Sequence, residues 1–217
     1  MESPTGRARR ILTARETWWA VGLTRTLQRW GVRPLVMALL AALFAMLAGI
    51  AFYNVPYSGR PEVWWAAGAL GIQIRLLFEL LGGMLMVTGM ARSRLDAFFA
   101  EGLATFSDAV VLVGVGYSVD IFLPGGADLG WCAALLAVFC EYVRVIGGSL
   151  GLPQLFTGPF GRQPRMYVIT FGAIAAGVQN AIFRPGWAMV PALLIVVIGT
   201  AWTISRRAEG IVRQLKA

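Results

Sequence analysis

Long apolar runs alternate with short polar or breaker-rich segments along most of the chain. Each run is close to the roughly 20 residues that a helix needs to cross a bilayer. Short connections such as Pro124-Gly125-Gly126 separate several of the runs. The pattern predicts an all-α integral membrane protein with six transmembrane helices, at about residues 34–54, 63–87, 105–123, 129–150, 166–183 and 186–205.

The region before the first apolar run has a different pattern. Residues 1–33 are rich in arginine and contain no run long enough to span a bilayer. Apolar residues recur on roughly one helical face between positions 11 and 30, namely Leu12, Trp19, Leu23, Leu27 and Trp30. This spacing predicts an N-terminal interfacial amphipathic helix that lies in the headgroup layer. The alternative is a solvated basic arm.

Composition supports the membrane class. The chain has 217 residues, of which 58% are hydrophobic and 14% are charged, and its mean hydropathy is +0.68, which excludes an ordinary soluble domain. The formal net charge is +8. Because the arginines cluster at the ends of the apolar runs, they indicate topology and headgroup contacts, and we expect no nucleic-acid partner. Cys132 and Cys140 lie eight residues apart in one run and are predicted to be packing residues.

Charge also predicts the orientation of the chain. Most basic residues lie in the N-terminal arm, in the 88–104 and 151–165 segments and after residue 205. The positive-inside rule places these segments, and therefore both termini, in the cytoplasm. We therefore expect a cytoplasmic arm over 1–33, a six-span domain over 34–205 and a basic cytoplasmic tail over 206–217. We expect a multi-pass protein of a bacterial-type inner membrane.

Carboxylates interrupt the second and third runs. Arg75 and Glu79 are four residues apart and share a helical face. Ionisable residues inside a span are candidates for a functional site, although a structural ion pair is the alternative. We expect Glu79 to be paired with Arg75 or with another basic group, because an unpaired carboxylate in hydrocarbon is costly.

The same stretch resembles a known signature. Residues 75–84, Arg-Leu-Leu-Phe-Glu-Leu-Leu-Gly-Gly-Met, and residues 106–109, Phe-Ser-Asp-Ala, resemble the flanks of the pattern D-x2-D-G-x2-A-R-x8-G-x3-D-x3-D in CDP-alcohol phosphatidyltransferases. The glycine at Gly83 is kept, and Glu79 retains a carboxylate. The second, third and fourth aspartates are replaced. When the pattern is aligned with this sequence without gaps, its eight fixed positions fall on Glu79, Gly82, Gly83, Met86, Val87, Asp96, Ala100 and Ala104.

The resemblance implies a six-span fold, a CDP-activated lipid as ligand and Mg²⁺ or Mn²⁺ as cofactor. Hard divalent cations need oxygen ligands, which glycine and alanine side chains do not supply. We therefore predict a degenerate, catalytically impaired relative in phospholipid biosynthesis, a pseudoenzyme without a metal cofactor that binds lipid or a partner protein.

Two alternatives remain open. The first is an active phosphotransferase that moves a phosphatidyl group from a CDP-activated lipid to an alcohol and releases CMP. Glu101 and Asp108 are seven residues apart on one helical face, so rebuilt ligands are geometrically possible; the alternative metal set is Glu79, Asp96, Glu101 and Asp108. The second is a small transporter, although the inverted repeats typical of that class are not seen in the sequence.

A second resemblance follows the fourth run. Residues 158–166, Gly-Pro-Phe-Gly-Arg-Gln-Pro-Arg-Met, resemble a Gly-Pro-Met-x-Lys-x-His-Arg-Met-like stretch in a bacterial branch of the family. Arg144, Arg162 and Arg165 are therefore candidates for holding a phosphate or a lipid headgroup. The alternative is positive-inside anchoring. The expected partners are membrane lipids, a CDP-activated lipid, and a second copy of the chain or a related subunit.

Overall fold

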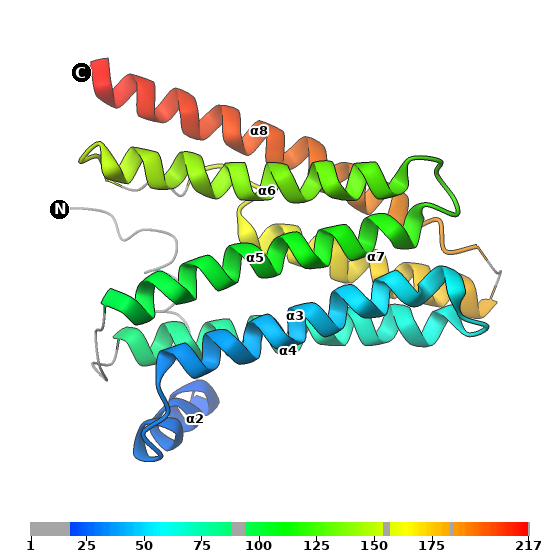
Figure 1. The fold of residues 1–217 in the computed structure, drawn as a ribbon, viewed down its shortest axis with the longest axis horizontal. Helices are drawn as coiled ribbons and strands as arrows, with labels where there is room; N and C mark the ends of the chain where they lie inside the picture. Colours follow the sequence, from blue (N-terminus) through cyan, green and yellow to red (C-terminus); the bar gives the residue numbers. More distant parts are fainter. Residues whose placement is uncertain (1–17, 88–93, 154–156, 183–184, 217) are drawn as a thin grey trace.

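The computed structural model describes residues 18–87, 94–153, 157–182 and 185–216. Leu12 and the rest of the predicted arm up to residue 17 lie outside the described residues. The described chain is all-α and forms an elongated bundle (Figure 1). A 3₁₀ turn, η1 (Val55–Tyr57), precedes α4. The α-helices are α2 (Trp18–Arg29), α3 (Pro34–Asn54), α4 (Pro61–Val87), α5 (Arg94–Val119), α6 (Gly126–Ser149), α7 (Arg162–Ile182) and α8 (Met189–Lys216).

Five of the described helices are long and apolar enough to cross a membrane, so the protein is a multi-pass membrane protein. They correspond to α3 with η1, α4, α5, α6 and α8. Helix α7 matches the fifth predicted run in position but is not among the five. Its first turn carries Arg162, Gln163 and Arg165, and its last turns carry Gln179 and Asn180, which lower its hydropathy.

Two helices extend beyond the predicted runs. Helix α5 begins at Arg94, although the sequence placed a connecting segment over 88–104. Asp96 and Glu101 lower the hydropathy there, while an acidic residue in the first turn is favourable to a helix. Helix α8 continues to Lys216, so the described part of the predicted tail is helical. Basic residues in its last turn suit the negative end of the helix.

Helix α3 organises one half of the bundle. It packs against both α4 and α5, whereas α4 and α5 make few contacts with each other. Helix α5 also packs against α6, α7 packs against α4 and α8, and α6 packs against α8 (Figure 1). Phe52, Trp65, Ile72 and Leu112 are fully buried in the core. Ion pairs show that the charged residues of α4, α5, α6 and α7 converge in this bundle.

Helix α2 lies beside the bundle, next to the start of α3 (Figure 1). Leu27 packs against a small apolar cluster that includes Met37, Leu81 and Leu85. Thr24 is buried, and its hydroxyl donates a hydrogen bond to the Ala20 carbonyl at 2.8 Å. One face of α2 is therefore attached to the membrane-spanning helices.

Glycines bring α5 and α6 close together. A Cβ atom added to Gly116 would lie 2.5 Å from the Cα atom of Gly130, which is closer than real Cβ contacts. Small residues of this kind allow helix backbones in membranes to approach each other. The contact brings the C-terminal half of α5 close to the first turns of α6.

We predict that Gly116→Ala lowers the free energy of unfolding in detergent by about 1–3 kcal/mol, because the new methyl group overpacks the crossing. Gly102→Ala, on the same helix with nothing within 4 Å of the added Cβ, is the matched control. It should leave stability unchanged or raise it by up to about 1 kcal/mol through helix propensity. Thermal unfolding of both variants checks this; equal effects would show that α5 and α6 do not meet closely at Gly116.

Candidate functional site

Five helices contribute to a buried group of charged side chains, which we call the charge cluster. It contains five arginines and four carboxylates, and most of these side chains are at least 90% buried. Charges at this depth require opposite charges or hydrogen bonds nearby. The members are Arg75 and Glu79 of α4, Glu101 and Asp108 of α5, Glu141 and Arg144 of α6, Arg162 and Arg165 of α7, and Arg207 of α8.

Asp108 lies at the centre of the charge cluster, with a side chain that is 1% exposed. It accepts hydrogen bonds from Nη2 of Arg75 and from Nη2 of Arg165 at 3.0 Å. Nε of Arg162 lies 3.6 Å from Oδ2 of the same carboxylate. Asp108 therefore joins α5 to α4 and to α7.

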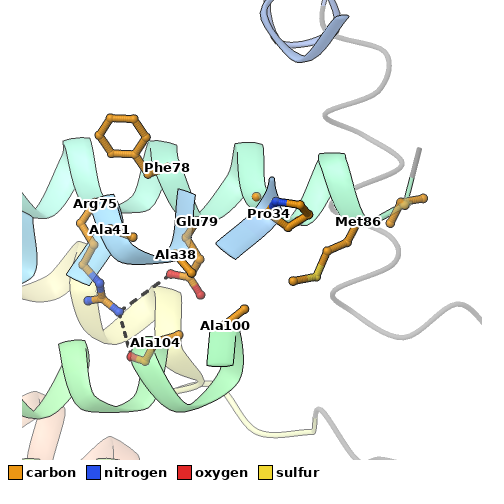
Figure 2. A pocket seen from close by; sticks show the side chains of 12 residues that line it. Pro34, Ala38, Ala41, Arg75, Phe78, Glu79, Met86, Ala100 and Ala104 are labelled. Atoms are coloured by element: carbon orange, nitrogen blue, oxygen red, sulfur yellow. Dashed lines mark hydrogen bonds and ion pairs between the residues drawn. The ribbon is translucent and has the colours of Figure 1, made fainter. Parts of the chain in front are cut away.

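Glu79 is shared between two arginines. Its Oε2 atom lies 3.8 Å from Nη2 of Arg75, and its Oε1 atom accepts a hydrogen bond from Nη1 of Arg162 at 3.3 Å. Nη2 of Arg75 also donates to the carbonyl of Ala104 at 3.3 Å (Figure 2). The prediction that Glu79 is paired is confirmed, but Arg75 makes its closest contact with Asp108 and not with Glu79.

Glu101 and Glu141 pair with the three arginines that the sequence analysis names as candidates for binding a phosphate. Arg144 donates to Oε2 of Glu141 at 2.9 Å and to Oε1 of Glu101 at 2.5 Å. Arg162 donates to the same Glu101 atom at 2.9 Å, and Arg165 lies 3.7 Å from Glu141. The structure thus brings Arg144, Arg162 and Arg165 together around shared carboxylates. Their role in binding a phosphate stays a prediction.

Arg207 is a member that the sequence analysis missed, because it was assigned to the tail. Its side chain is 3% exposed and lies 3.5 Å from Oε1 of Glu141. It also donates to the carbonyls of Cys140 at 2.8 Å and Thr157 at 3.2 Å. The helical period would have indicated its burial, because Thr200, Thr203, Arg207 and Ile211 form the buried stripe of α8.

A cavity of about 190 Å³ lies beside the charge cluster, between α3, α4 and α5. Among the described residues that line it, Arg75 and Glu79 are the charged ones (Figure 2). Seven of the eight aligned motif positions line it, which shows that the aligned residues converge in space. Asp96 is the exception. The lining residues are Pro34, Ala38, Ala41, Arg75, Phe78, Glu79, Gly82, Gly83, Met86, Val87, Ala100 and Ala104.

The side chains around this cavity do not fit a Mg²⁺ or Mn²⁺ ion. Such ions take several oxygen ligands, whereas the motif positions lining the cavity supply one carboxylate, Glu79, which is already engaged by two arginines. Within the described ranges, no three His, Cys, Asp or Glu side chains are grouped so that they could hold a metal ion.

The alternative metal set of Glu79, Asp96, Glu101 and Asp108 is therefore not assembled. Asp96 instead contacts Arg33, at 3.4 Å. Each of the other three is neutralised by arginines of the charge cluster. The physical reason is that a carboxylate already paired with guanidinium groups has fewer lone pairs left for a cation.

The amino-acid sequence matches no family model and no curated protein. Its fold, however, is similar to that of Mycobacterium tuberculosis phosphatidylinositol phosphate synthase (PgsA1). The crystal structure of that protein with CDP-DAG bound has a TM-score of 0.71 at 20% identity, covering 88% of this chain and 92% of that chain.

Two further crystal structures of the same synthase give similar values. The complex with manganese and citrate has a TM-score of 0.73 at 18% identity, covering 88% of each chain. The apo form has a TM-score of 0.69 at 19% identity, covering 87% of this chain and 93% of that chain. The protein therefore has the membrane fold of PgsA1, a CDP-alcohol phosphatidyltransferase.

Proposed function

We propose that the protein binds the anionic headgroup of a membrane lipid at the charge cluster, and that it does so without a divalent cation. The observation that supports this is an excess of donors. Five arginines face four carboxylates, and in the described residues four buried guanidinium nitrogens have no hydrogen-bond partner, namely Nη1 of Arg75, Nε of Arg162, and Nε and Nη1 of Arg165. Buried donors normally meet an acceptor, and phosphate oxygens are strong acceptors for guanidinium groups.

The position of the charge cluster favours a lipid as the source of the phosphate. Its arginines lie on membrane-spanning helices and on α7; Arg144 is close to the last residue of α6, and Arg162 and Arg165 are in the first turn of α7. Basic pockets between such helices suit phospholipid headgroups. The similar synthase has been crystallised with CDP-DAG bound, which supports a lipid-binding role for the shared fold. We assign the headgroup contacts to Arg144, Arg162 and Arg165.

We further propose that the protein is a pseudoenzyme of the CDP-alcohol phosphatidyltransferase type. Metal-assisted transfer at a diphosphate requires cations to neutralise the charge that develops as the bond breaks. Among the described residues that line the cavity, Glu79 is the one carboxylate that could be a ligand, and Arg75 and Arg162 already bind it. The residue at the position of the last motif aspartate is Ala104, whose methyl group cannot accept a proton from an alcohol.

The proposal includes a six-span topology with both termini in the cytoplasm of a bacterial-type inner membrane. Helix α7 has 21 residues, which is about 32 Å at 1.5 Å per residue and long enough to cross. It packs against α4 and α8, and its polar residues lie near its two ends. On α2 and just after it, the exposed Trp18, Trp19 and Trp30 suit a helix in the headgroup layer.

We predict that anionic lipid stabilises the purified protein equally in EDTA and in MgCl₂. Arg144→Gln should weaken lipid binding about tenfold or more, because it removes a charge-assisted donor. Arg206→Gln is the matched control, since Arg206 is an exposed arginine of α8. Thermal unfolding in phosphatidylcholine nanodiscs, with and without phosphatidic acid, measures the effect.

The competing function is an active phosphotransferase, and it predicts a different result. CDP-diacylglycerol and a panel of alcohols would then release CMP in Mg²⁺ or Mn²⁺, and the release would disappear in EDTA. We expect no release above the background of vesicles without protein. Release that Glu101→Gln or Asp108→Asn abolishes would contradict the pseudoenzyme assignment.

We predict that Ser58→Cys, in the turn before α4, reacts with an impermeant maleimide on intact cells. Glu209→Cys, on the exposed face of α8, should react only after permeabilisation. Both variants are made in a background with Cys132 and Cys140 replaced by serine. The reverse labelling pattern would contradict the proposed orientation.

A further inference from the structure

Glu101 differs from the other carboxylates of the charge cluster in its exposure. Its side chain is 29% exposed, compared with 16% for Glu79, 10% for Glu141 and 1% for Asp108. A single oxygen of Glu101, Oε1, accepts hydrogen bonds from Nη2 of Arg144 at 2.5 Å and from Nη2 of Arg162 at 2.9 Å. Glu101 is therefore the carboxylate of the cluster that reaches solvent or headgroups most readily.

The two arginines that hold Glu101 have other partners. Arg144 also pairs with Glu141, through Nε and Oε2 at 2.9 Å. Arg162 also pairs with Glu79 at 3.3 Å and donates a hydrogen bond to the hydroxyl of Thr105 at 3.2 Å. Departure of Glu101 would thus remove one acceptor from Nη2 of each arginine without leaving either guanidinium group unpaired, and Nη2 of Arg162 would still donate to Thr105.

Displacing Asp108 from its arginines would cost more than displacing Glu101. Asp108 is bound by Arg75 and Arg165, and its departure would remove the closest carboxylate from two fully buried arginines. An uncompensated buried charge is strongly destabilising. Among these four carboxylates, Glu101 is the one that an incoming anion can replace at the lowest cost.

We propose that the phosphate of a bound headgroup replaces the Glu101 carboxylate on Arg144 and Arg162. This inference rests on the proposed function and names the atoms at which the headgroup binds. Nη2 of Arg144 and Nη2 of Arg162 already converge on one oxygen, so they can converge equally on one phosphate oxygen. Glu101 is then an intramolecular competitor that occupies the site when no ligand is present.

The charge balance of the cluster defines the class of headgroup. Counted over the described residues, the cluster carries one more positive than negative charge with Glu101 in place and two more with Glu101 displaced. A phosphodiester with one negative charge only restores the charge that Glu101 supplied. A phosphomonoester or a diphosphate carries about two negative charges near pH 7 and neutralises the cluster. The site therefore selects dianionic headgroups over monoanionic ones.

The experiment uses the full chain in phosphatidylcholine nanodiscs that contain phosphatidic acid, CDP-diacylglycerol or phosphatidylglycerol. The first two lipids separate a phosphomonoester from a diphosphate, and the third is the monoanionic comparison. We expect the wild-type protein to bind at least one dianionic lipid about tenfold more tightly than phosphatidylglycerol, as measured by native mass spectrometry.

Replacement of Glu101 tests the competition directly. Glu101→Gln should raise the affinity for the dianionic and the monoanionic lipid by a similar factor of about ten, because both have to displace the same carboxylate in the wild-type protein. Glu209→Gln, which removes an exposed carboxylate of α8, should change neither affinity. Glu101→Asp keeps the charge but shortens its reach, and should give an intermediate increase.

The possible failures are distinguishable. If Arg144→Gln abolishes binding but Glu101→Gln leaves it unchanged or weakens it, the competitor inference is wrong and the lipid-binding function stands. If neither the wild-type protein nor Glu101→Gln binds any anionic lipid, both proposals are wrong. If both Glu101 variants fail to fold, Glu101 is a structural residue and the inference is also wrong.

Discussion

The ion pairs of Asp108 with Arg75 and Arg165 are the interaction on which the rest of the site depends. They link α5 to α4 and α7 through side chains that are almost completely buried. Removing one partner of such a group leaves an uncompensated charge, which costs several kcal/mol in a protein interior. Because α3 lies against both α4 and α5 while these two helices make few contacts with each other, the ion pair of Asp108 with Arg75 is a direct link between α4 and α5.

Two residues of these ion pairs, Arg75 and Asp108, lie one helical turn away from motif positions. Arg75 lies four residues, or about one helical turn, before Glu79, and Asp108 lies one turn after Ala104. Arg75 and Asp108 are therefore each displaced by one turn from positions 79 and 104, where the signature carries aspartates. The positions themselves line an apolar cavity. Under the proposed function, guanidinium groups would supply to a phosphate the positive charge that divalent ions supply in metal-assisted transfer.

Much of the fold followed from the sequence, because hydropathy and breaker residues determine where membrane helices begin and end. Gapless alignment also identified eight motif positions, seven of which the structure brings together around one cavity. Hydropathy did not reveal the first turns of α5, where Asp96 and Glu101 interrupt the apolar pattern. The spacing of four residues predicted the pairing of Arg75 with Glu79. The closer contact of Arg75 with Asp108, 33 residues away, and the inclusion of Arg207 depend on tertiary packing, which local spacing does not encode.

The central claim is that arginines, and not divalent ions, provide the positive charge at this site. Electron paramagnetic resonance of Mn²⁺ titrated into the purified protein tests it most directly, because bound and free Mn²⁺ give different spectra. The account predicts that the signal of free Mn²⁺ is the same with and without the protein. Loss of the free-ion signal in the wild-type protein, with recovery in Glu79→Gln, would contradict it.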